Sequence, residues 1–256
     1  MIAALPMYDR PETAGANDRL WALVRDRLRA DGVAAPTALR RGDLTLLDQW
    51  LDPSLVLSQT CGFPYRAKLH GYVTLVGTPD YGVAGCAPGY YRSVFVARAD
   101  DPRDDLAAFD GAGLAYNDAM SQSGWAAPQT HAAKLGITLP ALLETGGHRL
   151  SLHAVAEGRA DIAALDAVTW SMLAEWEDMA ARVKVVGMTD PTPGLPFITA
   201  LERDGQALFT AISAAIDDLG AADRALLRIK GIISIPVADY LSVPTPPAPN
   251  RFAPEK

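Results

Sequence analysis

Short apolar runs alternate with amphipathic segments along most of this chain, and the alternation limits the folds open to it. Predicted strands at residues 2–7, 37–40 and 55–58 alternate with two predicted helices, one capped by Asn17 and one at residues 44–51. This order indicates parallel strands joined by crossover helices. Ligands bind such sheets at the carboxyl ends of the strands. We therefore expect Tyr8 and Thr60, which follow the first and third strands, on one rim.

The same alternation continues through the rest of the chain. The predicted strands are residues 93–97, 113–116, 161–165, 183–187 and 197–200, and the predicted helices are residues 106–109, 124–134, 150–157, 170–181, 205–219 and 222–229. We expect two α/β lobes, a discontinuous lobe I of residues 1–91 plus 193–256 and a lobe II of residues 92–192. The proline-rich tail from Val243 is expected to lie extended on the surface.

Residues 117–125, which read Asn-Asp-Ala-Met-Ser-Gln-Ser-Gly-Trp, join a predicted strand to the helix that follows it. Backbone N–H groups in a first helical turn lack intrahelical acceptors, and the helix dipole adds roughly half a positive charge there. Ser121 and Ser123 add hydroxyl donors, and Gly124 lets a ligand approach the backbone closely. The segment predicts a site for a phosphate, phosphonate or carboxylate, while an ordinary serine N-cap explains the same residues.

The composition indicates a globular protein and excludes some partners. Of the 256 residues, 49% are hydrophobic and 21% are charged, which favours a folded chain over a disordered one. The net charge of −7 argues against binding to nucleic acid or an anionic membrane, because such contacts need clustered Lys and Arg. No apolar run is long enough to span a bilayer, and the apolar N-terminus is broken too early by Pro6 to be a signal peptide.

The two cysteines, Cys61 and Cys86, each lie beside a glycine in a predicted loop. A bridge between them would close without straining a strand, and the prediction favours it. Such a bridge would imply export, because disulfides persist in oxidising compartments. Two separate thiols are the alternative, since spacing alone does not bring two Cα atoms within about 7 Å.

Several motifs occur in order along the chain. They are Ser93-Val94-Phe95-Val96, the segment 106–111, Asn117-Asp118, Ser121-Gln122-Ser123-Gly124, Gly146-Gly147-His148, the segment 154–161 and Pro193-Gly194-Leu195-Pro196. Together they resemble the phosphonate/phosphate-type substrate-binding proteins of ABC importers, over roughly residues 2–240. The resemblance implies an α/β, two-lobed type II periplasmic-binding-protein fold. In such a fold each lobe is expected to hold a mainly parallel sheet flanked by helices, with the ligand cleft at the hinge.

The resemblance also implies the residues of the site. Family members seat an oxyanion on hydroxyls and N–H groups at a helix start, and these positions match Ser121, Gln122 and Ser123, with Gly124 beside them. A hydroxyl residue is common in the family where Gln122 stands, so the choice among phosphonate, phosphate and other anions stays open. His148, after two glycines, is expected to direct an imidazole N–H at the oxyanion.

Three further residues are predicted to complete the site. Asp166, at a strand end in lobe II, is expected to accept from a ligand ammonium or phosphoryl proton, and an N-cap is its alternative role. Tyr8 and Thr60 of lobe I are expected to swing over the anion by hinge closure, and turn residues are their alternative role.

The function implied by the resemblance is that of a periplasmic solute-binding component, monomeric and without metal or cofactor, that serves an ABC permease and ATPase. The alternative is an enzyme on the same scaffold, acting on a small organic acid or pyrimidine with Cys61, His148 or Asp166 as a catalytic residue. The sequence contains no Gly-x-Ser-x-Gly, P-loop or His-Glu-x-x-His motif, which favours the binding protein. Because no leader peptide is recognisable, a cytoplasmic location is the alternative to the periplasm.

Overall fold

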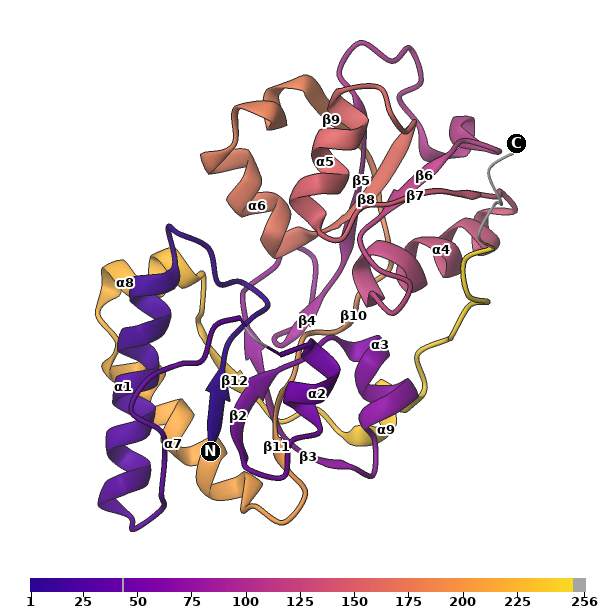
Figure 1. The fold of residues 1–256 in the computed structure, drawn as a ribbon. Coiled ribbons are helices and arrows are strands. Elements are labelled where there is room, and N and C mark those ends of the chain that lie inside the picture. The colour runs from indigo at the N-terminus through magenta and orange to yellow at the C-terminus, as the bar shows by residue number, and fades with distance from the viewer. Residues whose placement is uncertain (43, 251–256) are drawn as a thin grey trace. The chain divides into compact units, whose positions relative to one another are not determined.

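The computed structural model describes residues 1–42 and 44–250, which form two compact units (Figure 1). Unit 1 consists of Met1–Tyr90 and Pro193–Ser242. Unit 2 consists of Tyr91–Thr192 and the tail from Val243. Within the described residues, no helix has both the length and the apolar character needed to cross a membrane.

The tail is where the observed division differs from the predicted one. The prediction placed residues 243–256 in lobe I, whereas the described tail residues group with unit 2. The cause is a specific contact, because the indole Nε1 of Trp125 donates to the backbone carbonyl of Pro247 at 3.0 Å. Residues 251–256 lie outside the described residues.

A five-stranded sheet forms the centre of unit 1, in the order β1-β2-β11-β3-β12. The strands are β1 (Ile2–Ala4), β2 (Leu55–Gln59), β3 (Val73–Asp80), β11 (Phe197–Ala200) and β12 (Gly231–Ile233). Strands β1 and β2 are parallel, and the other neighbours are antiparallel. The antiparallel pairing has a simple cause, since β11 begins soon after the chain enters unit 1 and its Phe197 pairs with Gln59, where β2 ends.

Helices cover both faces of this sheet. They are α1 (Ala14–Ala30), α2 (Leu46–Trp50), α3 (Gly62–Pro64), η1 (Tyr65–Leu69), α7 (Gly205–Asp218), α8 (Ala221–Leu227) and α9 (Val237–Leu241). Leu20, Val24 and Leu28 follow one another at helical spacing on α1 and pack with the buried row of α7 against one face. Trp50, Tyr65 and Tyr240 pack against the other face.

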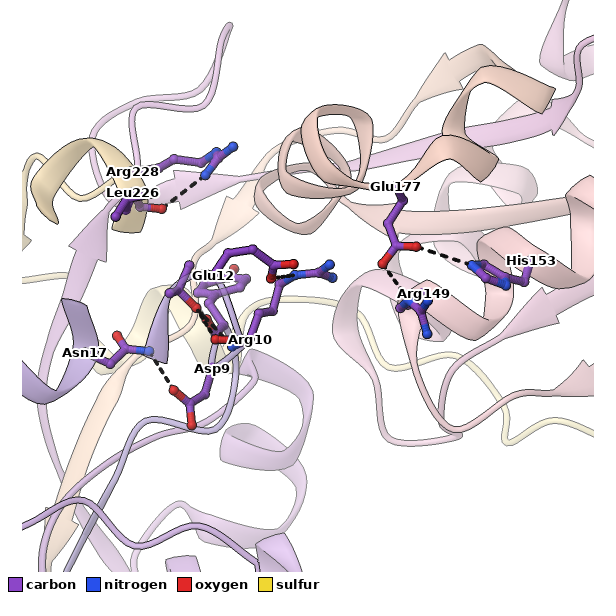
Figure 2. Close-up of polar contacts among 11 residues, drawn as sticks. Asp9, Arg10, Glu12, Asn17, Arg149, His153, Glu177, Leu226 and Arg228 are labelled. Carbon is purple, nitrogen blue, oxygen red and sulfur yellow. Dashed lines mark hydrogen bonds and ion pairs between the residues drawn. The ribbon is translucent and has the colours of Figure 1, made fainter. Parts of the chain in front are cut away.

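Two local predictions in unit 1 are wrong. Asn17 does not cap a helix, because α1 already begins at Ala14 and the Asn17 amide instead donates to Asp9 at 3.1 Å (Figure 2). Residues 37–40 do not form a strand. The segment makes one backbone hydrogen bond to β1, from Arg40 N–H to the Ala3 carbonyl at 2.7 Å, where a strand would need a ladder.

Unit 2 is built on a second five-stranded sheet, in the order β7-β6-β8-β5-β9. The strands are β5 (Ser93–Arg98), β6 (Leu114–Tyr116), β7 (Ala141–Glu144), β8 (Ile162–Asp166) and β9 (Val183–Met188). Strand β6 is parallel to β7 and β8, whereas β5 is antiparallel to β8 and β9. Ser93, at the start of β5, pairs with Asp166, at the end of β8. The short strands β4 (Tyr90–Tyr91) and β10 (Thr192–Pro193) pair where the chain passes between the units.

The helices of unit 2 are η2 (Leu106–Phe109), η3 (Gln122–Ala126), α4 (Ala127–Leu135), α5 (His148–Ala156), α6 (Ala167–Trp176) and η4 (Asp178–Arg182). Leu152 and Val155 of α5 are fully buried against Val96 and Leu165 of the sheet. On the opposite face, His131 of α4 lies beside Phe95, with ring centroids 6.1 Å apart. The sheet is therefore covered on both sides, as in unit 1.

The predicted fold class, an α/β chain of two lobes with helices on both faces of each sheet, is confirmed. The sheets themselves are mixed, not mainly parallel as expected. In each unit the strand that follows a crossing runs opposite to the strand it pairs with, because it starts at the edge where that partner ends.

Candidate functional site

The chain between β6 and α4 folds into a tight turn before the helix begins. The Asp118 carboxylate accepts from the Met120 N–H at 2.6 Å, and the Asp118 carbonyl accepts from the Ser121 N–H at 3.0 Å. An aspartate that bonds its own backbone two residues on is a common way to start such a turn. The turn brings Ser121 to the N-cap position of the following helix.

The first turn of that helix, η3, is of the π type. Ser121 Oγ accepts from the Gly124 N–H at 3.0 Å, and the Ser121 carbonyl accepts from the N–H of Ala126, five residues on, at 3.0 Å. The helix begins at Gln122, two residues before the predicted start, and ends at Leu135, one residue after the predicted end, with Gly136 as its C-cap at φ of 72°. Wide π turns occur often at functional sites.

Ser121, Gln122 and Ser123 are all buried, with exposures of 7%, 2% and 3%. Ser123 is held from two sides, since its carbonyl accepts from Ser93 Oγ at 2.8 Å and its own Oγ lies 2.9 Å from His148 Nε2. Burying polar side chains costs free energy unless they are hydrogen-bonded. The helix start therefore buries several polar side chains at a position where apolar side chains would stabilise the protein more.

Burial lowers the pKa of His148 to about 4, and the Ala164 carbonyl near the ring opposes the shift only slightly. The imidazole is therefore neutral at neutral pH. Nδ1 is inaccessible to solvent and makes no hydrogen bond within the described residues. The ring Nε2 faces Ser123 Oγ, and the predicted contact of His148 with an oxyanion stays a prediction.

Two proton arrangements satisfy the contact between His148 and Ser123. With the proton on Nε2, His148 donates to Ser123 Oγ, and the serine proton is available to another acceptor. With the proton on Nδ1, Ser123 donates to Nε2 and offers no proton elsewhere. Only the first arrangement lets Ser123 Oγ donate to a bound anion.

Gly124 stands where a side chain would meet a neighbouring residue. A Cβ on this residue would lie 1.8 Å from Asn117 Oδ1 and 2.9 Å from Asn117 Cγ. The missing side chain thus makes room for the Asn117 amide, and the predicted approach of a ligand to Gly124 stays a prediction. Asn117 Oδ1 is buried there and accepts no hydrogen bond from any described residue, so the turn retains a polar atom with unused bonding capacity.

The start of α5, where His148 lies, is fixed by neighbouring contacts. Figure 2 shows Glu177 between Arg149 and His153, with Arg149 Nε donating to one carboxylate oxygen and His153 Nε2 3.6 Å from the other. Thr145 Oγ1, just before the helix, lies 2.7 Å from Ser151 Oγ. These contacts hold the helix on which the His148 ring is mounted.

Asp166 is only 2% exposed and caps α6. Its Oδ1 accepts from the N–H groups of Val168 at 2.7 Å and Thr169 at 2.9 Å. The capping role that the sequence left open is thus present, and the ligand-binding role of Asp166 stays a prediction.

Tyr8 and Thr60 are both buried in unit 1, with exposures of 7% and 0%. The Tyr8 ring packs edge to face with Tyr81, at 5.0 Å between centroids, and lines a small cavity of about 20 Å³. The Thr60 N–H donates to the Pro196 carbonyl at 3.0 Å. Their predicted contacts with a ligand stay predictions.

The predicted disulfide between Cys61 and Cys86 is not formed, because the structure has both residues as thiols. Each is placed by its own local turn. Cys61 is the N-cap residue of α3, and the Cys86 N–H donates to the Val83 carbonyl at 3.1 Å. Among the described residues, no group of three or more His, Cys, Asp or Glu side chains is arranged to hold a metal.

Sequence reasoning missed three contributors to the site. The hydroxyl of Ser93 and the amide of Asn117 reach the helix start from other elements, so only the tertiary structure brings them there. Trp125 packs on Tyr116, with centroids 5.1 Å apart, and bonds Pro247 of the tail. Ser93 and Asn117 belong to motifs on which the family resemblance was based. Those motifs were the sequence signal that could have identified the two residues.

Two α/β units, with a buried polar helix start after strand β6, are the arrangement expected of a two-lobed solute-binding protein. The chain belongs to the family described as ABC transporter, phosphonate, periplasmic substrate-binding protein, which matches residues 58–240. The resemblance predicted from the sequence is therefore confirmed. A comparison with curated proteins gave no match.

Solved structures with a similar fold include other binding proteins. PhnD1 from Prochlorococcus marinus, in complex with methylphosphonate, has a TM-score of 0.70 at 14% identity, over 93% of this chain and 94% of that one. A binding component of an ABC phosphonate transporter from Pseudomonas aeruginosa has a TM-score of 0.69 at 16% identity, over 94% and 82%. XAC2383 from Xanthomonas citri, bound to chloride, has a TM-score of 0.67 at 17% identity, over 93% of each chain. At these identities the likeness supports the fold alone.

Proposed function

We propose that this protein binds a small oxyanion, a phosphonate or phosphate, on the η3 turn of unit 2 and delivers it to an ABC permease and ATPase. The observation that carries the proposal is the buried run Ser121, Gln122 and Ser123 at a helix start, with His148 bonded to Ser123. Helix starts favour anions through their unsatisfied N–H groups and the helix dipole.

The donors of this turn can be counted. Ser121 Oγ uses its oxygen to accept from Gly124, which leaves its own proton to donate. The backbone N–H of Ser123 has no acceptor among the described residues, and the Ser123 hydroxyl becomes a donor once the His148 proton lies on Nε2. These groups supply three bonds to an anion from one turn.

The free energy that three hydrogen bonds supply shows whether this turn alone can bind an anion at micromolar concentration. Charge-assisted hydrogen bonds contribute about 1.5–3 kcal/mol each, so three give roughly 5–9 kcal/mol before ordering costs. Micromolar binding needs about 8 kcal/mol net. Further contacts are therefore needed, and the predicted ones are donation by the Tyr8 and Thr60 hydroxyls and acceptance of a ligand proton by Asp166. Capture by hinge closure likewise stays a prediction.

The remaining parts of the proposal follow the family. We place the protein in the periplasm, as a monomer that carries its ligand without converting it. Because PhnD1 was solved in complex with methylphosphonate, that compound is a suitable first ligand to test. Incubation of the protein with methylphosphonate, followed by ³¹P NMR, should return the compound unchanged, and a new phosphorus signal would favour an enzyme instead.

Calorimetry tests the site directly. Methylphosphonate, phosphate, phosphite and malate should be titrated into the protein, and one of the phosphorus anions should bind at micromolar concentration. Ser123→Ala should weaken that binding by about 10–100-fold, since it removes one charge-assisted bond. Ser171→Ala, the same change on α6, is the matched control and should leave the affinity unaltered. Equal affinities in both variants would remove the η3 turn from the proposal.

A further inference from the structure

The backbone carbonyl of Ser123 lacks both of the donors that its own helix would offer. In an α-helix this carbonyl would accept from the N–H four residues on, at Ala127. That N–H donates instead to the Gln122 carbonyl, five residues back, as the π pattern requires. The next donor in the π pattern would be residue 128, which is a proline and has no N–H. Within the described residues, neither of these helical donors therefore serves the Ser123 carbonyl.

A side chain from another element supplies the missing donor. Ser93, at the start of β5, donates from its Oγ to the Ser123 carbonyl at 2.8 Å. Both residues are buried, with exposures of 1% and 3%. A buried carbonyl that loses its hydrogen bond is costly, because water cannot replace the donor. The Ser93 hydroxyl thus takes the place of the N–H that Pro128 lacks.

The backbone of Ser93 is itself fixed by the sheet. Its N–H donates to Thr189 Oγ1 at 2.9 Å, and its carbonyl accepts from the Thr189 N–H at 2.9 Å. On the other side, Ser93 pairs with Asp166 at the end of β8. A hydroxyl on a strand that is bonded on both sides cannot follow the helix start if the helix start moves. Ser93 therefore holds the Ser123 carbonyl at a defined place relative to the sheet.

The bond from Ser93 decides between two registers of the η3 turn. In the observed π register, the Ala127 N–H serves Gln122 and the Ser93 hydroxyl serves Ser123. Without that hydroxyl, the Ala127 N–H can satisfy the Ser123 carbonyl only by moving to it, which converts the turn to the tighter α register. Such a change alters the directions in which the side chains and N–H groups of the turn point.

We propose that Ser93 is a positioning residue for the oxyanion site. It keeps the η3 turn in the π register, so that the donors of Ser121 and Ser123 point to the anion, and it does not contact the anion itself. This inference rests on the proposed function of the η3 turn. Hydrogen bonds weaken steeply when the donor leaves its preferred direction, so a change of register should weaken anion binding.

Calorimetry with methylphosphonate tests the role of Ser93. Ser93→Ala should weaken binding about tenfold, which corresponds to the loss of one charge-assisted bond. Ser93→Thr keeps a hydroxyl donor at the same place and should restore most of the affinity. Thr199→Val is the matched control, because Thr199 Oγ1 is also buried and donates to a backbone carbonyl, that of Leu55 in unit 1, at 3.2 Å. Thr199→Val should lower the urea midpoint, as Ser93→Ala does, but leave the affinity unaltered.

NMR couplings across hydrogen bonds report the register of the turn in the absence of ligand. In the unaltered protein, the Ala127 amide nitrogen should couple to the carbonyl carbon of Gln122. In Ser93→Ala, this coupling should move to the carbonyl carbon of Ser123. A coupling that stays at Gln122 in Ser93→Ala would overturn the proposal, because the register would then not depend on the hydroxyl.

Ser123→Ala separates a failure of this inference from a failure of the proposed function. If Ser123→Ala weakens methylphosphonate binding and Ser93→Ala does not, Ser93 has no positioning role although the anion site stands. If Thr199→Val weakens binding as much as Ser93→Ala does, lost stability is the cause and the proposal is wrong. If neither serine variant alters binding, the proposed function fails and this inference fails with it.

Discussion

The two units each contain a strand that leads into a helix with a π-type first or second turn, and the two junctions differ in chemistry. In unit 1, β2 leads through Thr60 and Cys61 into α3 and η1. In unit 2, β6 leads through the turn at Asp118 into η3 and α4. In both units, the backbone therefore passes from a strand into a helix that contains a π-type turn. The unit 1 helix start lacks a side-chain cap, whereas Ser121 caps the unit 2 start.

The surroundings of the two helix starts account for this difference. Phe63, Tyr65 and Tyr240 are buried around the unit 1 junction, with Tyr65 and Tyr240 5.3 Å apart between centroids. The unit 2 junction instead buries hydroxyl, amide and imidazole groups. A helix start alone is thus a weak indicator of an anion site. Polar side chains that remain buried there, against their desolvation cost, are the stronger one.

The largest expected effect comes from exchanging the glycine of each junction for alanine. In Gly124→Ala the new Cβ overlaps Asn117 Oδ1 at 1.8 Å, so the amide or the turn must move. Overpacking of this kind costs about 1–3 kcal/mol, and we expect oxyanion binding to be lost as well. In Gly62→Ala the nearest atoms are the Tyr240 ring at 3.7 Å and the Pro193 carbonyl at 3.8 Å, which are ordinary contacts.

Urea unfolding and calorimetry on both variants measure this contrast. Gly62→Ala should keep its stability, or gain up to about 1 kcal/mol from helix propensity. The second change Asn117→Ala, made in Gly124→Ala, should restore stability because it removes the atom that clashes. If Gly124→Ala is as stable as the parent without that change, the amide does not occupy the place described.

The next effect is a pH dependence of stability that His148, buried in unit 2, should confer. The folded-state pKa of His148 is about 4, below the ordinary value of about 6.5, so the unfolded chain binds a proton that the folded chain does not. Stability should therefore fall as pH falls from about 6.5 to 4, by at most about 1.4 kcal/mol per pH unit, and this loss ends below the folded pKa. Burial also lowers the pKa of His131 on α4, so this residue contributes a loss of stability in the same direction.

Unfolding curves at pH 7, 6, 5 and 4 check this expectation. His148→Gln should reduce the dependence, and the part that remains includes the contribution of His131. An equally steep loss of stability in His148→Gln would assign the effect to other groups.

A smaller effect should separate the two roles of Ser121. Ser121→Ala removes the cap bond to the Gly124 N–H, which costs about 1 kcal/mol of stability. Ser121→Asp keeps a capping oxygen and adds a charge that the helix dipole favours, so stability should be retained. The same carboxylate repels an oxyanion, so binding should be lost. Retained binding in Ser121→Asp would place the anion away from this turn.

Sequence patterns predicted most of the secondary structure, and the failures have local causes. The row Leu20, Val24 and Leu28 identified α1 because the helix is amphipathic. Strand β3 was not predicted because Gly77 and Pro79 interrupt its apolar pattern, yet it pairs on both sides. The mixed sheets were missed because strand direction depends on where the chain enters each unit.

The polar helix start was predicted in place, but the contacts around it were not. Ser121, Gln122 and Ser123 were identified from the helix start and the family motifs. The direction of the His148 ring and the role of Gly124 depend on Ser123 and Asn117, whose contacts join segments separate in sequence. The disulfide was predicted from neighbouring glycines, which reflect local turns and not the approach of two cysteines.

The smallest expected effect concerns a contact that only the unit 2 junction has. Trp125 Nε1 donates to the Pro247 carbonyl, and this bond attaches the tail to η3. At the unit 1 junction, the Tyr240 hydroxyl instead bonds to Thr78 and Gly194, which both belong to unit 1. Trp125→Phe keeps an aromatic ring on Tyr116 and removes the donor, at a cost of about 0.5–1.5 kcal/mol. The Pro247 carbonyl can then be solvated, so we expect hydrogen exchange near residues 245–250 to accelerate while exchange in α9 is unchanged. If the tail keeps its protection in Trp125→Phe, packing and not this hydrogen bond holds it on unit 2.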